Sequence, residues 1–157
     1  MATTPVSVDS GAAVYTLLSQ LTNIGLQVGQ IMQDVNSNHY RMLVQNNSGG
    51  TLTAAAGDAL IWSSNSAKSV TTSSAIQQLV VGINDLSGQS VANGNYFWMT
   101  IRGDVAKVKT TGSPAANVIL ATTAIAGTLG AIGASVTQTT IVTTAAAVGA
   151  TNTAYMY

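Results

Sequence analysis

The residue types that could carry out chemistry are few in this sequence and stand far apart. His39 is the single histidine, and the chain contains no cysteine and no glutamate. His39 therefore has no neighbour at the spacing of a metal-ligand pair or of a nucleophile and its base. The five aspartates are Asp9, Asp34, Asp58, Asp85 and Asp104. All of them except Asp34 stand beside Gly, Asn or Ser, where Asp commonly forms hydrogen bonds within turns. We expect no metal site and no cofactor.

The common catalytic and nucleotide-binding motifs are also missing from the sequence. We find no Gly-x-Ser-x-Gly elbow, no carboxylates at acid–base spacing, no Gly-x-Gly-x-x-Gly loop and no Walker-type loop. The glycines at 127, 130 and 133 recur every three residues and predict small-residue turns. We therefore predict that the chain is not an enzyme and takes no small-molecule substrate.

Charge is unusually scarce. Only 6% of the residues are Asp, Glu, Lys or Arg, and the formal net charge is zero, whereas about 25% charged residues is usual for soluble domains. A chain with 46% hydrophobic residues and little charge to keep copies apart is expected to bury apolar surface between chains. The same neutrality argues against nucleic acid as the main partner, because phosphate binding needs a basic surface. The prediction is self-association.

No segment of the sequence predicts a membrane anchor. There is no run of about 18 apolar residues and no N-terminal segment with the pattern of a secretion signal. We expect a protein that is made in the cytoplasm and does not enter membranes.

The N-terminal 39 residues predict an extended arm followed by one helix. Residues 1–9 carry no helical period, whereas Ser10 is a possible N-cap before a stripe of apolar residues at helical spacing. The stripe extends over three heptads to Val35, which would suit an intermolecular bundle of helices. Alternatively, the helix ends near Gly25 and lies on the molecule's own core, with a loop or strand from Leu26 onward.

From Tyr40 the period changes to two, which predicts strands. Strands are expected at 40–45, 59–62, 79–83, 96–101 and 105–109, with Arg102-Gly103-Asp104 as a break between the last two. Further short strands are expected in the Ala- and Thr-rich last third. The sequence thus predicts a mainly β fold, a small β-barrel or β-sandwich over 40–157, with the arm and helix at 1–39.

The segment 96–101 places large apolar side chains on both of its faces. Phe97, Met99 and Ile101 share one face, and Tyr96 and Trp98 share the other. We expect one face to meet the chain's own core and the other to meet a neighbouring subunit.

The order of three segments and the composition after them resemble a known family. Residues 57–62, 80–83 and 95–106 read Gly-Asp-Ala-Leu-Ile-Trp, Val-Val-Gly-Ile and Asn-Tyr-Phe-Trp-Met-Thr-Ile-Arg-Gly-Asp-Val-Ala, and a Gly-, Ala- and Thr-rich end follows. This order is similar to that of head decoration (cement) proteins of tailed bacteriophages and, more widely, of small phage virion structural proteins. The resemblance covers about residues 50 to 135 and leaves out the helical stretch at 10–35.

The resemblance implies a β-barrel subunit, commonly a homotrimer, on the outer head surface of the virion. Its partners would be the major capsid protein and further copies of itself, and it would stabilise the shell by bridging capsid subunits. The alternatives are another virion component, such as a head fibre, neck or tail subunit, or a carbohydrate-binding adhesion module that stacks sugars on Trp62, Tyr96 or Trp98. The residues expected to contact the capsid are Pro5, Val6, Val8, Val14 and Tyr15, and those expected in self-association are Leu17, Leu21, Tyr96 and Trp98.

Overall fold

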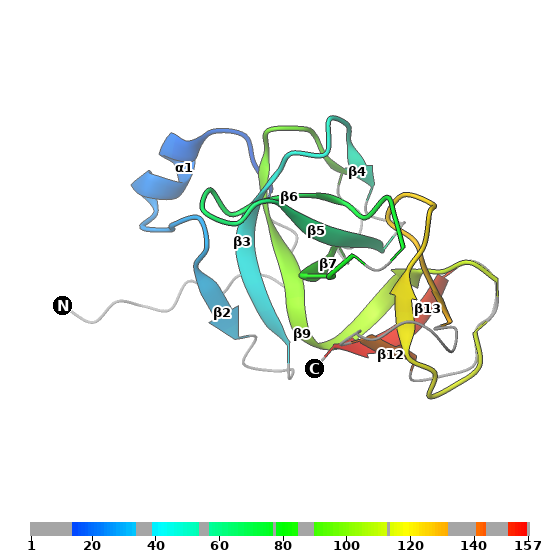
Figure 1. The fold of residues 1–157 in the computed structure, drawn as a ribbon. Helices are drawn as coiled ribbons and strands as arrows, with labels where there is room; N and C mark the ends of the chain where they lie inside the picture. The colour runs from blue at the N-terminus through cyan, green and yellow to red at the C-terminus, as the bar shows by residue number, and fades with distance from the viewer. Residues whose placement is uncertain are drawn as a thin grey trace.

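A computed structural model provides the fold (Figure 1). It describes residues 14–33, 39–53, 57–76, 78–84, 90–112, 114–131, 141–143 and 151–156. The elements, in chain order, are β1 Val14–Tyr15, α1 Leu18–Asn23, β2 Ile31–Gln33, β3 Tyr40–Asn46, β4 Leu52–Thr53, β5 Asp58–Ser64, β6 Ser69–Thr72, β7 Gly82–Asn84, β8 Ser90–Val91, β9 Tyr96–Lys109, β10 Leu120–Thr122, β11 Leu129–Ala131, β12 Ile141–Thr143 and β13 Thr151–Met156.

The fold is mainly β and is built around a closed five-strand barrel, as the sequence predicts. Around the barrel, β9 pairs with β7, β7 with β5, β5 with β6, β6 with β3, and β3 again with β9. The β3–β6 pair is parallel and the other four pairs are antiparallel. Closure leaves the ring without an edge of its own.

The barrel interior is filled by alternate side chains of its strands. Val44, Leu60 and Val70 from β3, β5 and β6 meet Phe97 and Met99 from β9 in one buried cluster. The period of two in the sequence therefore identifies the inward face of β9 correctly.

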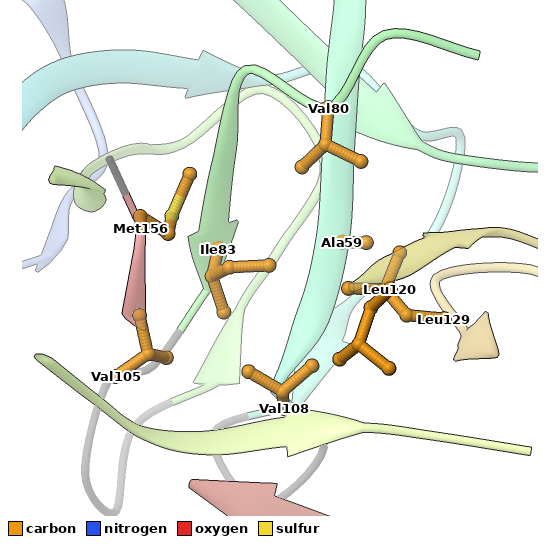
Figure 2. Packing of buried hydrophobic residues seen from close by; sticks show 8 residues of the cluster. All are labelled: Ala59, Val80, Ile83, Val105, Val108, Leu120, Leu129 and Met156. Carbon is orange, nitrogen blue, oxygen red and sulfur yellow. The ribbon is translucent and has the colours of Figure 1, made fainter. Parts of the chain in front are cut away.

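A second buried cluster lies outside the barrel wall, over the continuation of β9 (Figure 2). Beyond Gly103, β9 leaves β3 and pairs antiparallel with β13. Figure 2 shows side chains of β5, β7, β9 and β13, of the β10–β11 hairpin and of the segment just before β7 gathered in this cluster: Ala59, Val80, Ile83, Val105, Val108, Leu120, Leu129 and Met156.

Gly57 allows the start of β5 to lie directly against β9. Its φ is +61°, and a Cβ here would approach the carbonyl of Lys107 and lie 2.9 Å from Cα of Val108. The amide of Lys109 donates a hydrogen bond to the Gly57 carbonyl at 3.0 Å. Only glycine meets both the backbone angle and the spacing at this position.

The long heptad helix is not formed; the alternative of a short helix is confirmed. Gly25, at φ +74°, ends α1: its amide donates to Thr22 O at 3.1 Å, and the amide of Leu26 donates to Leu21 O at 2.9 Å. This is a Schellman motif, which stops a helix. The expected helix start at Ser10 lies outside the described residues, and Val14 belongs to strand β1 instead.

Two strand predictions need correction. Arg102-Gly103-Asp104 does not break the strand, because Gly103 takes a φ of +102° and β9 continues through it while changing partners. The strand expected at 79–83 is β7, which covers only Gly82–Asn84.

The N-terminal segment is part of the main sheet. β1 pairs with β9 and β2 pairs with β3. The expected division between 1–39 and 40–157 therefore runs through one continuous sheet. Residues 1–13, which include the expected arm at 1–9, lie outside the described part.

Candidate functional site

Four large apolar side chains between residues 17 and 31 are exposed, and we call this set surface A: Leu17, Leu18, Ile24 and Ile31. They belong to α1, its two ends and strand β2. Isolated exposed apolar residues are ordinary, whereas a group of them is typical of surfaces that take part in interactions.

The helix that carries most of surface A is fixed to the barrel by packing and hydrogen bonds. Beneath it, Leu21 of α1 packs with Leu43 of β3 and Trp98 of β9 in a third buried cluster. The side chain of Gln20 accepts hydrogen bonds from the amides of Thr16 and Leu17, at 2.8 and 3.1 Å. Strand β1 adds a second attachment to β9, so the helix is held at both its buried face and its N-terminal end.

A second set of exposed apolar side chains lies on the three segments that connect β6 to β7, β9 to β10 and β10 to β11, and we call it surface B: Ile76, Leu79, Ile119 and Ile125. Hydrogen bonds join the first of these segments to β10 and to the β10–β11 turn. The Gly127 amide donates to Ser73 O at 2.8 Å, and the Gln78 amide donates to Thr122 Oγ1 at 2.9 Å. Across surfaces A and B the exposed fractions run from 44% to 64%.

Both surfaces lie on segments of the chain that carry no charge. The stretches 10–33, 69–84 and 110–157 contain no Asp, Glu, Lys, Arg or His. All ten charged residues therefore fall elsewhere in the sequence. This is a sequence signal that could have located the exposed apolar residues, but periodicity alone did not.

One buried carboxylate connects the barrel to the loops of surface B. Asp58 Oδ1 lies 3.6 Å from Nζ of Lys109, and a Cβ on Gly127 would lie 2.5 Å from the same oxygen. Burial raises the pKa of Asp58 above its ordinary value of 3.8, and the Lys109 ammonium offsets part of that rise. The Lys109 ammonium also donates to Ala126 O at 3.5 Å, so the pair holds the 126–127 turn against β5.

The polar groups near Asp58 do not form a metal centre. Asn84 faces Asp58 across strands β5 and β7 and is fully buried, and neither atom of its side-chain amide has a hydrogen-bond partner among the described residues. In the described part of the chain, no three His, Cys, Asp or Glu residues are grouped so as to hold a metal ion. Likewise, no helix within those ranges is long and apolar enough to cross a membrane.

The residues predicted to contact a capsid are only partly described. Pro5, Val6 and Val8 lie outside the described residues. Val14 and Tyr15 form β1 and are half-buried against β9.

The residues predicted for self-association are divided between surface and interior. Leu17 is exposed and Tyr96 is half-buried, whereas Leu21 and Trp98 are 0% and 1% exposed. The expectation that Trp98 and Leu21 face a second copy is corrected, because the chain's own helix α1 covers this face of β9. Sequence alternation predicts which side chains share a face but not which element covers them.

Trp62, which was considered as a stacking platform for a sugar, is half-buried. It packs partly against the barrel interior, and Nζ of Lys68 lies 5.3 Å from the centre of its ring. A cation over the ring occupies a face that a sugar would use.

No family model and no curated protein matches the chain.

Proposed function

We propose that the chain is a structural virion protein, a head decoration protein that binds the outer shell of a capsid and stabilises it by bridging capsid subunits. The observation that carries the proposal is the pair of exposed apolar surfaces on charge-free segments of a neutral chain. Such surfaces favour a protein whose working state is covered by other proteins. The resemblance of residues 50 to 135 to phage decoration proteins supplies the kind of assembly.

In this proposal the N-terminal arm and β1 contact the major capsid protein, through Pro5, Val6, Val8, Val14 and Tyr15. Strand β1 supports this role because its pairing with β9 fixes where the arm joins the barrel. Self-association, expected to give a trimer, uses the apolar surfaces instead. A ligand that binds the assembled shell stabilises it in proportion to its binding free energy.

The test is binding to heads of the parent virus that were assembled without this chain. Full-length protein should co-sediment with the heads, saturate at a fixed ratio to capsid subunits and raise the temperature at which the heads break. A variant lacking residues 1–13 should bind much more weakly. The deletion stops at 13 because removing β1 and α1 would uncover Trp98 and damage the fold.

The melting temperature of the truncated variant serves as its folding control. An unchanged melting temperature with lost binding supports the proposed role of the arm, and unchanged binding contradicts it. No binding of the full-length chain to heads, with binding to tails or to a glycan array, would overturn the decoration proposal in favour of another virion part or a carbohydrate-binding module.

A further inference from the structure

The turn between β8 and β9 places an asparagine directly before a glycine. The amide of Asn95 donates a hydrogen bond to the carbonyl oxygen of Ala92 at 3.1 Å, which closes the turn, and Gly94 takes a φ of +88°. Asn93 is exposed. A Cβ added to Gly94 would meet no described atom within 4 Å beyond its chain neighbours. No bulky group therefore separates the Asn93 side chain from the peptide bond that follows it.

An asparagine in this position can undergo deamidation. The glycine nitrogen attacks Cγ of the asparagine side chain, a new N–Cγ bond forms, and the Cγ–Nδ2 bond breaks with release of ammonia. The amide proton of the glycine passes through solvent to the departing nitrogen. Water then opens the cyclic imide at either carbonyl, which gives aspartate or isoaspartate. Glycine favours the attack because it has no side chain to hinder it, but its nitrogen must first be free of other bonds.

In the folded chain the two reacting groups are hydrogen-bonded elsewhere. The amide of Gly94 donates to the carbonyl oxygen of Asn46 at 2.7 Å. Oδ1 of Asn93 accepts a hydrogen bond from the amide of Gly49 at 2.9 Å. In addition, Nε2 of Gln45 donates to the carbonyl oxygen of Gly94 at 3.0 Å. The end of β3 and the turn after it thus hold the reacting groups apart.

We infer that Asn93 is a deamidation site that the fold keeps closed, and that it reacts when the turn at 92–95 separates from the end of β3. Hydrogen bonds near a surface open locally without unfolding of the whole chain. Where opening and closing are fast compared with the chemistry, the rate follows the fraction of molecules that is open. These hydrogen bonds therefore set the rate at Asn93, although its side chain is already exposed.

Deamidation at Asn93 would release the turn permanently. Isoaspartate adds a methylene group to the main chain before Gly94, which disturbs the spacing between the Gly94 amide and Asn46. Either product also places a carboxylate where a neutral amide stood, in a chain whose formal net charge is zero. Strand β9 begins just after this turn, where Tyr96 pairs with Tyr15 of β1. The modified chain is therefore expected to hold β1 less firmly.

The experiment compares two processes at the same amide. Deamidation of Asn93 is measured by peptide mass spectrometry, and hydrogen exchange of the Gly94 amide is measured by NMR. Each is measured in the folded full-length chain and in the same chain in urea at the same pH. Both processes require the Gly94 N–H to leave Asn46, so folding should slow both by a similar factor, of about tenfold or more.

Two variants test the contacts that keep the site closed. Gln45→Ala removes the hydrogen bond to the Gly94 carbonyl and should speed deamidation of the folded chain by about two- to tenfold, the effect of one ordinary hydrogen bond. Gln78→Ala is the matched control. Gln78 is also half-buried, but its side chain accepts hydrogen bonds from the amides of Ser74 and Ala75 in its own segment. It should leave the rate at Asn93 unchanged.

Three results would overturn the inference. The first is an equal rate of deamidation at Asn93 in the folded chain and in urea, because the fold would then give no protection. The second is the lack of deamidation at Asn93 in urea. The third is a slowing of deamidation that differs from the slowing of amide exchange by more than about tenfold, because opening of the Gly94 N–H would then not control the reaction.

Discussion

Asp58 combines two opposing effects in one side chain. Burial disfavours its charged form, and the ammonium of Lys109 at 3.6 Å favours it. Burial is the larger effect, so the carboxyl holds its proton to a higher pH in the folded chain than in the unfolded one. The sequence predicted that Asp58 lies in a turn. Its burial under the turn at 126–127 could not be predicted, because a contact with a distant segment leaves no local signal in the sequence.

The pKa of Asp58 predicts a fall in folding stability as the pH rises. Below pH 3.8 the carboxyl is protonated in both states; above it the unfolded chain releases the proton first. This group's contribution to the free energy of unfolding therefore decreases from pH 3.8 up to its raised folded pKa and is level beyond it. Asp58→Asn removes this titration, so the free energy of unfolding of the variant relative to wild type should increase with pH.

Urea unfolding of the wild type and Asp58→Asn, below pH 3.8 and again at neutral pH, measures the effect. Lys109→Gln is the companion variant. It should make the decrease in the free energy of unfolding with pH larger, because it removes the attraction between the ammonium and the carboxylate. A relative stability of Asp58→Asn that decreases with pH would mean that the ion pair outweighs burial.

Helix α1 is an element that only tertiary packing holds in place. It has six residues, too few for an isolated helix to be stable in water. Its buried contact is Leu21, which packs against Leu43 and Trp98. Leu18, in the same helix, is exposed. Leu21 therefore anchors the helix to the core, whereas Leu18 belongs to its exposed apolar surface.

Leu21→Ala should lower the free energy of unfolding by about 2–5 kcal/mol, the usual cost of a cavity at a buried leucine. Leu18→Ala, the matched control in the same helix, should change it by no more than about 0.5 kcal/mol. Chemical denaturation measures both values. Tryptophan fluorescence should shift to the red only in Leu21→Ala, as Trp98 loses its cover. Equal losses from the two variants would contradict the assigned orientation of α1.

The elements that the sequence predicts well are those whose pattern is local. Alternation identifies β3 and the first half of β9, and the short run at 59–62 identifies β5. The strand at 105–109 was predicted, but its continuity with 96–101 was missed because Gly103 resembles a turn residue, whereas its positive φ redirects one strand toward β13. Strand β13 has no strong pattern of its own and depends on β9 for its pairing.

The candidate site was less predictable than the fold. The stripe from Val14 to Leu21 has helical spacing, but β1 uses its first residue and Gly25 stops the helix. Tryptophan is a residue type that is common at interfaces, but Trp98 is buried under α1. Whether a large side chain meets its own chain or a neighbour depends on distant elements, which a single segment does not encode.

At the scale of the whole molecule, charged residues and apolar surfaces fall on different stretches of the sequence, although Lys68 lies against Gly29 beside surface A and Lys109 against the turn that carries Ile125. Asp58, Lys68, Arg102 and Lys109 stand on the barrel strands or on the turn joining β5 to β6, whereas surfaces A and B stand on charge-free segments. In the proposed self-association, contacts through these surfaces would therefore depend mainly on removal of apolar area from water.

Self-association should consequently be almost insensitive to sodium chloride. Between about 0.05 M and about 1 M salt, screening shortens the reach of charges to about 3 Å, which weakens ionic contacts and leaves apolar ones intact. The dissociation constant from light scattering should thus change by less than about threefold over this range. Sodium sulfate should lower it, because excluded salts strengthen apolar burial. A rise of the dissociation constant by about tenfold or more in sodium chloride would show that charged residues such as Arg102 form the contact, which would contradict self-association through the apolar surfaces.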